Sequence, residues 1–196
     1  MEARLTPRAL LCVAGIAAVA AAMSGCGGGA GAQAASKRPL PARYASPSLS
    51  FVHPAAWQAY PFRWPGELHF RPLVYLSTQR VENPCATQGN TTKCGFPVRR
   101  LRPGGVLITW NASGPPASAL GPGAQITLDG RPARRLDATG GTCRAIGADR
   151  TIDVLVATRP LPSTLMELTA CLRGPGLAQN VKRVDALLAS TKFLSQ

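Results

Sequence analysis

The sequence predicts an α+β fold, with an antiparallel sheet of about six to seven strands and a C-terminal amphipathic helix packed on it; an α/β/α sandwich is the alternative arrangement. Three features indicate this class. Short apolar or alternating runs recur through residues 49–172, Asp129-Gly130 has the sequence of a hairpin turn, and apolar residues recur at helical spacing near the C-terminus.

Three strands are predicted in the first half of the domain. Residues 49–52 form an opening strand, and residues 54–57 follow as a tight turn or a single helical turn. Residues 68–77 alternate well enough for a second strand, in which Pro72 marks a bulge or an edge position. The β-branched run at residues 106–110 is typical of a central strand.

Further strands and the helix are predicted in the second half. Residues 125–136 form two short strands about the Asp-Gly turn, and residues 142–146 pair with residues 151–158. Residues 165–172 fit a helix or a strand, and we prefer a strand because alternate residues then form two consistent faces. After Gly174-Pro175-Gly176, residues 177–190 have helical periodicity.

The N-terminus has the features of a bacterial export signal. A basic start precedes a short apolar run, and Met23-Ser24-Gly25-Cys26 resembles the lipobox of bacterial lipoproteins. The resemblance implies cleavage before Cys26 and attachment of diacylglycerol and palmitate-type acyl chains to it, which would hold the protein on the extracytoplasmic face of the cell membrane. A plain secretory signal is the alternative.

Composition divides the chain into three parts. Residues 1–25 are the lipoprotein signal peptide, and residues 26–46, rich in Gly, Ala and Pro, form a flexible tether. Residues 47–196 form a single α+β domain of ordinary size.

The chain is strongly basic, with a formal net charge of +13. For an exported protein, this charge favours an anionic lipid or glycan as partner and makes nucleic acid an unsuitable one. Lys37, Arg38 and Arg43 follow the predicted anchor closely, so we expect them to contact lipid head groups. The alternative is that the scattered charges form an ordinary solvated surface.

Four cysteines remain after the signal peptide and Cys26 are set aside. Four cysteines in an exported domain indicate two disulfides, with three possible connectivities that the sequence leaves open. We choose the local one, Cys85 with Cys94 and Cys143 with Cys171, because the first pair flanks a polar loop and the second lies on two neighbouring predicted strands. A four-cysteine zinc site is disfavoured, since neither spacing is the short Cys-x2-Cys pattern. No metal ligand or cofactor is predicted.

Aromatic residues are concentrated early in the domain, with seven between positions 51 and 75. Trp57, Tyr60 and Trp64 are therefore candidate ligand-binding residues that would line a groove for an apolar ligand. Such a cluster is also how a small domain fills its core.

Little in the sequence indicates catalysis. His53 and His69 are the two histidines, and the motif Gly-x-Ser-x-Gly is absent. Asp149 and Asp153 are the nearest carboxylates along the domain and form no tight pair. We predict no catalytic residues.

Several short motifs support a family resemblance. Together with the lipobox, the chain resembles small actinobacterial lipoproteins of unassigned activity through the segments Asn83-Pro84-Cys85, Cys94-Gly95-Phe96-Pro97, Gly130-Arg131-Pro132-Ala133 and Ala170-Cys171-Leu172-Arg173-Gly174-Pro175. The order of elements is also loosely similar to the PsbP/Mog1-like fold, whose members are accessory and binding proteins. These resemblances imply no functional residues.

We therefore expect a non-enzymatic, membrane-anchored envelope lipoprotein with an accessory or binding role toward a protein partner or an anionic envelope component. The alternative is a carrier or sensor of an apolar ligand that uses the aromatic cluster at 51–75. A hydrolase of wall polymer ranks behind both because no nucleophile motif is present.

Overall fold

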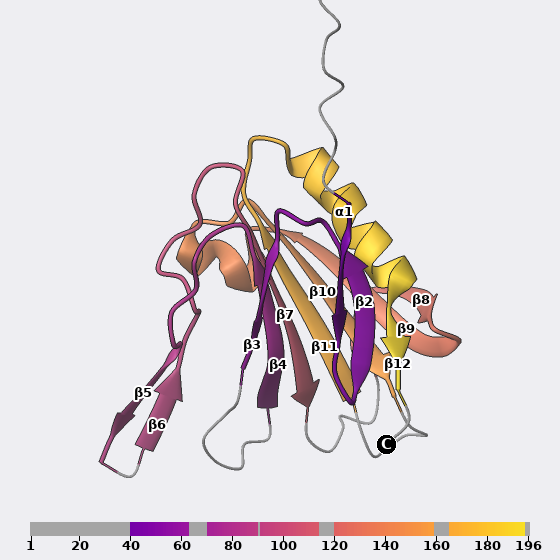
Figure 1. The fold of residues 1–196 in the computed structure, drawn as a ribbon, viewed down its shortest axis with the longest axis horizontal. Coiled ribbons are helices and arrows are strands. Elements are labelled where there is room, and N and C mark those ends of the chain that lie inside the picture. Colours follow the sequence, from indigo (N-terminus) through magenta and orange to yellow (C-terminus); the bar gives the residue numbers. More distant parts are fainter. Residues whose placement is uncertain (1–39, 63–69, 90, 114–119, 159–164, 195–196) are drawn as a thin grey trace, which may run out of the picture. The chain divides into compact units, whose positions relative to one another are not determined.

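Seven antiparallel strands form the main sheet of the computed structural model, which describes residues 40–62, 70–89, 91–113, 120–158 and 165–194 (Figure 1). In spatial order, the strands are β3 (Gln58–Pro61), β4 (Phe70–Ser77), β7 (Val106–Ser113), β11 (Leu165–Leu172), β10 (Arg150–Ala157), β9 (Arg131–Thr139) and β8 (Ala124–Leu128). The predicted α+β class and its antiparallel sheet are confirmed. The structure also confirms the hairpin about Asp129-Gly130 and the choice of strand for residues 165–172.

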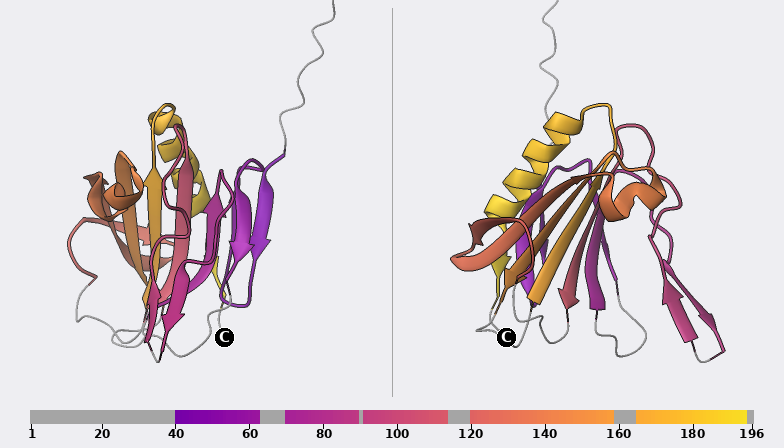
Figure 2. Two further views of the ribbon diagram at one scale, coloured as in Figure 1. Left: turned by 90° about the vertical axis from the view of Figure 1, so that its left-hand side faces the viewer. Right: turned by 180° about the vertical axis from the view of Figure 1, so that it is seen from behind.

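Two smaller sheets and two helical segments complete the described part of the chain (Figure 2). They are the three-stranded sheet of β1 (Ala42–Ala45), β2 (Leu49–His53) and β12 (Lys192–Phe193), the hairpin of β5 (Cys85–Gln88) and β6 (Thr91–Cys94), the 3-10 helix η1 (Gly141–Ile146) and the helix α1 (Leu177–Ser190). The helix coincides with the predicted residues 177–190. Strand β1 lies inside residues 26–46, which were predicted as a flexible tether. It is a strand because its backbone pairs with that of β2.

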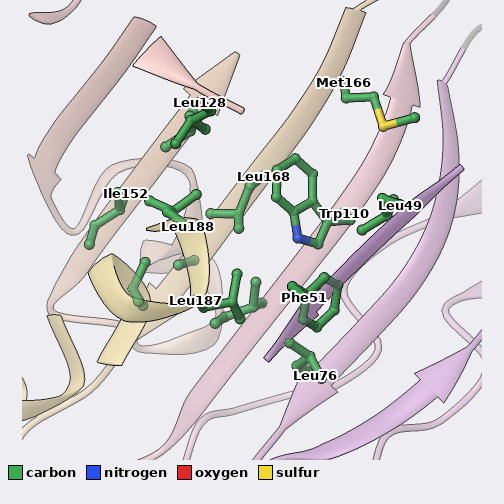
Figure 3. Close-up of a cluster of buried hydrophobic side chains, with 14 of the residues drawn as sticks. Leu49, Phe51, Leu76, Trp110, Leu128, Ile152, Met166, Leu168, Leu187 and Leu188 are labelled. Carbon is green, nitrogen blue, oxygen red and sulfur yellow. The ribbon is translucent and has the colours of Figure 1, made fainter. Parts of the chain in front are cut away.

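The main core lies on one face of the seven-stranded sheet. Side chains alternate between the faces of a strand, so Ile108, Val154 and Leu168 point to the same side and are fully buried. Leu187 and Leu188 of α1 belong to the same apolar cluster (Figure 3). The three-stranded sheet contributes further members of this cluster, which are Leu49, Phe51 and Phe193.

Arg135 and Asp185 join β9 to α1 on this same face. Their Nη1 and Oδ1 atoms are 2.6 Å apart. The helix begins after Gly176, whose φ of 84° suits glycine, and it buries Val184 on the side that faces the cluster. The amphipathic pattern predicted from the sequence is therefore the pattern of burial.

Strand β4 shows why Pro72 is tolerated inside a sheet. The strand lies between β3 and β7, so it is not an edge strand. The register with β7 shifts between Pro72 and Val74, which identifies a β-bulge. Of the two alternatives predicted for Pro72, the bulge is confirmed.

The predicted strand at residues 142–146 is wrong. These residues belong to η1, which begins at Gly141 (φ 56°) and is flanked by Gly140 (φ 69°) and Gly147 (φ 75°), all with positive φ. Such backbone is readily adopted by glycine, and it reverses the chain where a strand would need extended residues. The segment therefore folds as a short turn over the end of the sheet.

A second apolar cluster lies on the face of the main sheet opposite α1. It consists of Tyr75, Val98, Leu101, Leu107, Cys143, Ile146, Ala148 and Cys171. These residues come from η1, the segment around residue 100 and one end of β4, β7 and β11. The remaining part of this face carries polar side chains of β7, β10 and β11 together with the leucines at positions 136 and 155.

Candidate functional site

A row of four polar side chains crosses the face of the sheet opposite α1. In register, Tyr75 of β4 pairs with Thr109 of β7, Thr109 pairs with Thr169 of β11, and Thr169 pairs with Asp153 of β10. Residues directly across antiparallel strands project to the same face. The four side chains therefore form one continuous row.

A second row runs beside the first. Asn111 of β7 pairs with Glu167 of β11, and Glu167 pairs with Leu155 of β10. Since Glu167 is two residues from Thr169, its carboxyl group lies diagonally across from Asp153. The sheet thus brings together two acidic residues that are far apart in the sequence.

These rows form the floor of a groove with a volume of about 640 Å³, which we call the acidic groove. Thr92, Phe96 and Pro97, from the β5–β6 hairpin and the residues after it, form one wall. A smaller cavity of about 240 Å³ adjoins it and shares both carboxylates. Arg134, Leu136 and Leu155 are among the residues that line the smaller cavity.

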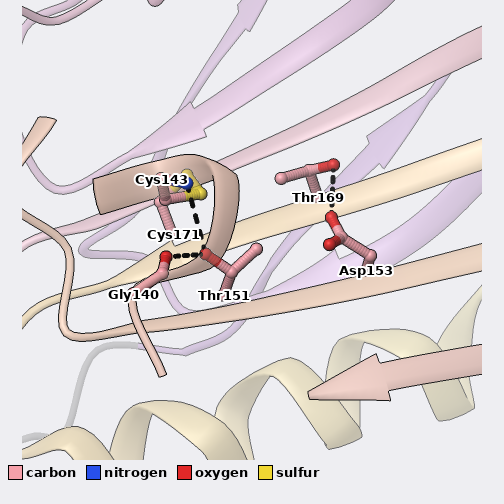
Figure 4. The surroundings of a disulfide bond; sticks show 6 residues. All are labelled: Gly140, Cys143, Thr151, Asp153, Thr169 and Cys171. Carbon is pink, nitrogen blue, oxygen red and sulfur yellow. Dashed lines mark hydrogen bonds between the residues drawn. A yellow bond between two sulfur atoms is a disulfide. The ribbon is translucent and has the colours of Figure 1, made fainter. Parts of the chain in front are cut away.

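Burial sets the electrostatics of the acidic groove. It raises the pKa of Asp153, while a hydrogen bond from Thr169 Oγ1 to Asp153 Oδ1, 2.9 Å long, acts in the opposite direction (Figure 4). Burial also raises the pKa of Glu167, and the neighbouring charge of Asp153 raises it further. Tyr75 has its pKa raised to about 12 by burial, so its hydroxyl stays protonated at neutral pH.

Asn111 is the most buried polar residue of the groove floor, with 2% of its surface exposed. Its Oδ1 atom has no hydrogen-bond partner within the part of the chain that the structure describes. Buried amides nearly always have such a partner, and leaving one unpaired costs about 1–3 kcal/mol. Asn111 is therefore a group whose hydrogen bonding is incomplete without a further molecule.

The Cys143–Cys171 disulfide fixes η1 to β11 next to the acidic groove (Figure 4). Thr151 Oγ1 donates to the carbonyl of Gly140 and accepts a 3.3 Å hydrogen bond from the backbone N–H of Cys143. The second disulfide, Cys85–Cys94, closes the hairpin that forms a wall of the groove. Both predicted pairings are confirmed, although Cys143 lies on a 3-10 helix and not on a strand.

A different surface carries a concentration of unpaired positive charge. The loops at one end of the main sheet are tied together by hydrogen bonds: Leu101 N–H donates to the carbonyl of Ile146 (2.8 Å), and Gly104 N–H donates to that of Gly174. In these loops lie Arg80, Arg99, Arg100, Arg102, Arg144 and Arg173, which we call the arginine end.

The arginine end is concentrated and largely unneutralised. Five of its arginines are exposed, and the side chains of Arg100 and Arg173 both approach Gly147, within 3.6 Å of where its Cβ would lie. None of the six forms an ion pair with a residue that the structure describes. Glu82 and Asp149 are the acidic residues in the same loops. The surface therefore carries an excess of positive charge.

Of the three aromatic residues predicted to bind a ligand, the two that the structure describes lie in different apolar clusters. Trp57 is 1% exposed and belongs to the main core. Tyr60 is half-buried against the second cluster, on the opposite face of the sheet, and it donates a hydrogen bond to Gln58 Oε1. Trp64 lies outside the described residues.

Some of the other residues singled out in the sequence lie among the described residues, and the rest lie outside them. Arg43 is exposed on β1, whereas Cys26, Lys37 and Arg38 lie outside the described residues. His53 is 5% exposed, and its Nδ1 lies 3.0 Å from the carbonyl oxygen of Pro54.

The sequence did not predict the acidic groove. Asp149 and Asp153 are closest along the chain, yet the sheet pairs Asp153 with the strand of Glu167. The alternation within residues 151–158 and 165–172 does place each carboxylate opposite the core face. It does not give the register that brings them together.

The described residues have neither a metal-binding cluster nor a helix suited to span a membrane. They contain no group of three or more His, Cys, Asp or Glu side chains placed to hold a metal ion. No helix in this part of the chain has the length and apolar character needed to cross a membrane.

No protein-family model, curated protein or solved structure was found to match the chain. The fold and its surfaces therefore define the class: a disulfide-linked α+β domain with an acidic groove on one sheet face and an arginine-rich end.

Proposed function

We propose that this protein is a non-enzymatic, lipid-anchored lipoprotein of the extracytoplasmic membrane face, and that it binds an anionic component of the cell envelope through the arginine end. The concentration of six arginines without ion-pair partners among the described residues is the observation that carries this proposal. In this proposal, α1 and the three-stranded sheet have a structural role, since they pack on one face of the main sheet.

Anionic phospholipid is the component that the fold favours. Ala42, the first residue of β1, pairs with His53, the last residue of β2. Strand β3 begins soon after, at Gln58, which pairs with Ser77, the last residue of β4. Thr78 then hydrogen-bonds to Val106, beside the arginine loops. The domain thus begins at its arginine end, so a short tether from lipid-modified Cys26 would bring that end toward the bilayer.

The attraction between the arginine end and an anionic membrane would be strong enough to orient the domain on the membrane. A basic residue near an anionic leaflet contributes about 1 kcal/mol, and this contribution is screened within a Debye length of about 8–10 Å. Several arginines on one surface would therefore hold the domain against the membrane at physiological salt. The same surface would be released at high salt.

The geometry of the two groove carboxylates gives no support to a glycosidase. Asp153 and Glu167 project from the same sheet face, whereas the carboxylates of a glycosidase flank the bond that they cleave. Trp57 belongs to the core cluster, which gives no support to a role in binding an apolar ligand. Membership among small actinobacterial lipoproteins and likeness to the PsbP/Mog1-like fold remain hypotheses based on the motifs and the order of elements.

The experiment compares the anchored full chain in nanodiscs of anionic phosphatidylglycerol and of zwitterionic phosphatidylcholine. Hydrogen exchange of backbone amides in residues 98–105 and 140–150 is the readout. We expect slower exchange in the anionic nanodiscs, and we expect added salt to remove the difference. Mass spectrometry of the same sample tests for diacylglycerol on Cys26.

A charge-matched pair of variants makes the experiment specific. Arg99→Gln with Arg102→Gln removes two charges from the arginine end, and Arg71→Gln with Lys93→Gln removes two exposed charges elsewhere. The protection should be lost in the first variant and kept in the second. Equal exchange in both kinds of nanodisc would contradict the proposal.

A further inference from the structure

We propose that the acidic groove binds a small organic cation, with an ammonium group held between Asp153 and Glu167 and against Asn111. This site is on the sheet face and is separate from the arginine end, so it goes beyond the function proposed above. The ligand class is a primary amine carried on a short apolar chain or ring.

The floor of the acidic groove has unfilled hydrogen-bonding capacity. Asp153 receives one side-chain hydrogen bond, from Thr169, and Glu167 receives none from the described residues. Asn111 is 2% exposed and lines the groove with an unpartnered amide oxygen. The floor therefore has hydrogen-bond acceptors without donors. An ammonium group has three donors and no acceptor, so it complements them.

The negative charge of the groove has no positive partner among the described residues. Both carboxylates are partly removed from water, which disfavours their ionised forms unless a positive charge lies nearby. Arg134 lines the adjoining cavity, but its Nη1 donates to the carbonyl of Gly123 (3.3 Å), and it forms no ion pair with either carboxylate. Tyr75, the other titratable group of the floor, is neutral at physiological pH. A cationic ligand would supply the missing charge, whereas an anion would add to the repulsion.

The size and the wall of the groove suit a small organic molecule. Its volume of about 640 Å³ falls within the range of small-molecule sites, about 300–1,000 Å³. Phe96, which is 36% exposed, and Pro97 present apolar surface beside the acceptors. Aromatic rings attract ammonium groups through the negative charge of their faces. Floor and wall together fit an amine attached to an apolar segment.

The experiment uses the full chain in a non-ionic detergent and n-pentylammonium as the probe. Proton–nitrogen NMR spectra report the side-chain amide of Asn111 and the backbone amides of Thr109, Glu167 and Thr169. We expect pentylammonium to shift these resonances with a single saturable binding curve. Pentanol, which has the same apolar chain without the charge, and pentanoate, which has the opposite charge, should not shift them at the same concentrations.

Matched variants assign the binding to the carboxylates. Asp153→Asn and Glu167→Gln keep the shape of each side chain and remove its charge, and each should weaken pentylammonium binding about tenfold or more. Glu82→Gln removes an exposed carboxylate outside the groove and should leave the affinity unchanged. Dispersed NMR spectra of all three variants establish that each one is folded.

Each other result counts against the proposal. Equal shifts with pentanol would indicate an apolar site without charge recognition. Unchanged affinity in both Asp153→Asn and Glu167→Gln would indicate that the amine binds elsewhere, and the absence of shifts at Asn111 and Thr169 with millimolar pentylammonium would overturn the site. None of these results bears on the arginine end, whose test uses nanodiscs and other residues.

Discussion

Asp153 and Glu167 lie diagonally across the β10–β11 strand pair, because Asp153 pairs with Thr169 and Glu167 pairs with Leu155. The two carboxyl groups share the floor of one groove and one adjoining cavity. This relationship places two like charges side by side on a partly buried surface, which costs stability that a ligand would recover.

Replacing Glu167 by Gln should therefore stabilise the unliganded protein at neutral pH. Burial raises the pKa of Glu167, so between the ordinary glutamate pKa and this raised pKa the folded protein binds more protons than the unfolded chain. Stability therefore falls as pH rises through that range. We expect Glu167→Gln to raise the melting temperature by a few degrees at pH 7. Below a pH of about 4, where the carboxyl group is protonated in both states, the difference should close. A lower melting temperature at pH 7 would contradict this account; Glu82→Gln is the exposed control.

The opposite pH dependence is expected at Asp129. Its carboxylate accepts hydrogen bonds from Lys192 Nζ and from the backbone N–H of Phe193, both 2.9 Å long, and these bonds lower its pKa. The stability that they contribute is present above the ordinary carboxyl pKa and is lost as pH falls through the lowered one. Asp129→Asn should therefore lower the melting temperature by a few degrees at pH 7 and have little effect in acid.

Asparagine is the suitable substitute at this position. Asp129 has a φ of 48°, a left-handed conformation that asparagine adopts readily. Asp185→Asn, which removes an exposed ion pair with Arg135, is the control and should change stability by about 1 kcal/mol or less. If Asp129→Asn and Asp185→Asn behave alike, the backbone contact to Phe193 contributes little.

Trp57 should act as a core residue. It is 1% exposed in the main apolar cluster, so Trp57→Ala is expected to lower the free energy of unfolding by about 3–5 kcal/mol. Tyr60→Ala, at a half-buried position, should cost less. Urea denaturation of both variants measures the difference. A Trp57→Ala protein of unchanged stability would return Trp57 to the list of candidate ligand-binding residues.

The two disulfides should contribute in different ways. Loop lengths set by sequence separations of 28 and 9 residues give about 3.6 kcal/mol for Cys143–Cys171 and about 2.7 kcal/mol for Cys85–Cys94. Replacing Cys143 and Cys171 by Ser should lower the melting temperature more, because both residues also belong to a buried cluster. Replacing Cys85 and Cys94 should chiefly weaken pentylammonium binding, because their hairpin forms a wall of the acidic groove. Thermal unfolding and NMR titration measure the two effects, and the reverse ranking of melting temperatures would contradict this prediction.

Local pattern was sufficient for most of the elements. The amphipathic repeat of residues 177–190, the Asp129-Gly130 turn and the β-branched run at 106–110 each have a cause within a few residues of the chain. The error at residues 142–146 is also local. The glycines on either side, which favour turns, have more influence on the backbone there than the apolar content does.

The two sites depend on information that local pattern does not contain. The acidic groove requires the register of β7, β10 and β11, and a shift of one residue would send Asp153 and Glu167 into the core. The arginine end requires four separate loops to meet at one end of the sheet. In the sequence, its arginines look like scattered surface charge.

The sequence by itself determined the α+β class, the helix and most strands, because hydrophobic periodicity and turn residues act over short distances. Of the three possible disulfide connectivities, the structure shows the local one. It also predicts an exported, lipid-anchored chain from residues 1–26. Only the tertiary structure decided which side chains are neighbours. It buried Trp57 in the core and brought Asp153, Glu167 and Asn111 together in one groove, because strand pairing joins residues that are distant in the sequence.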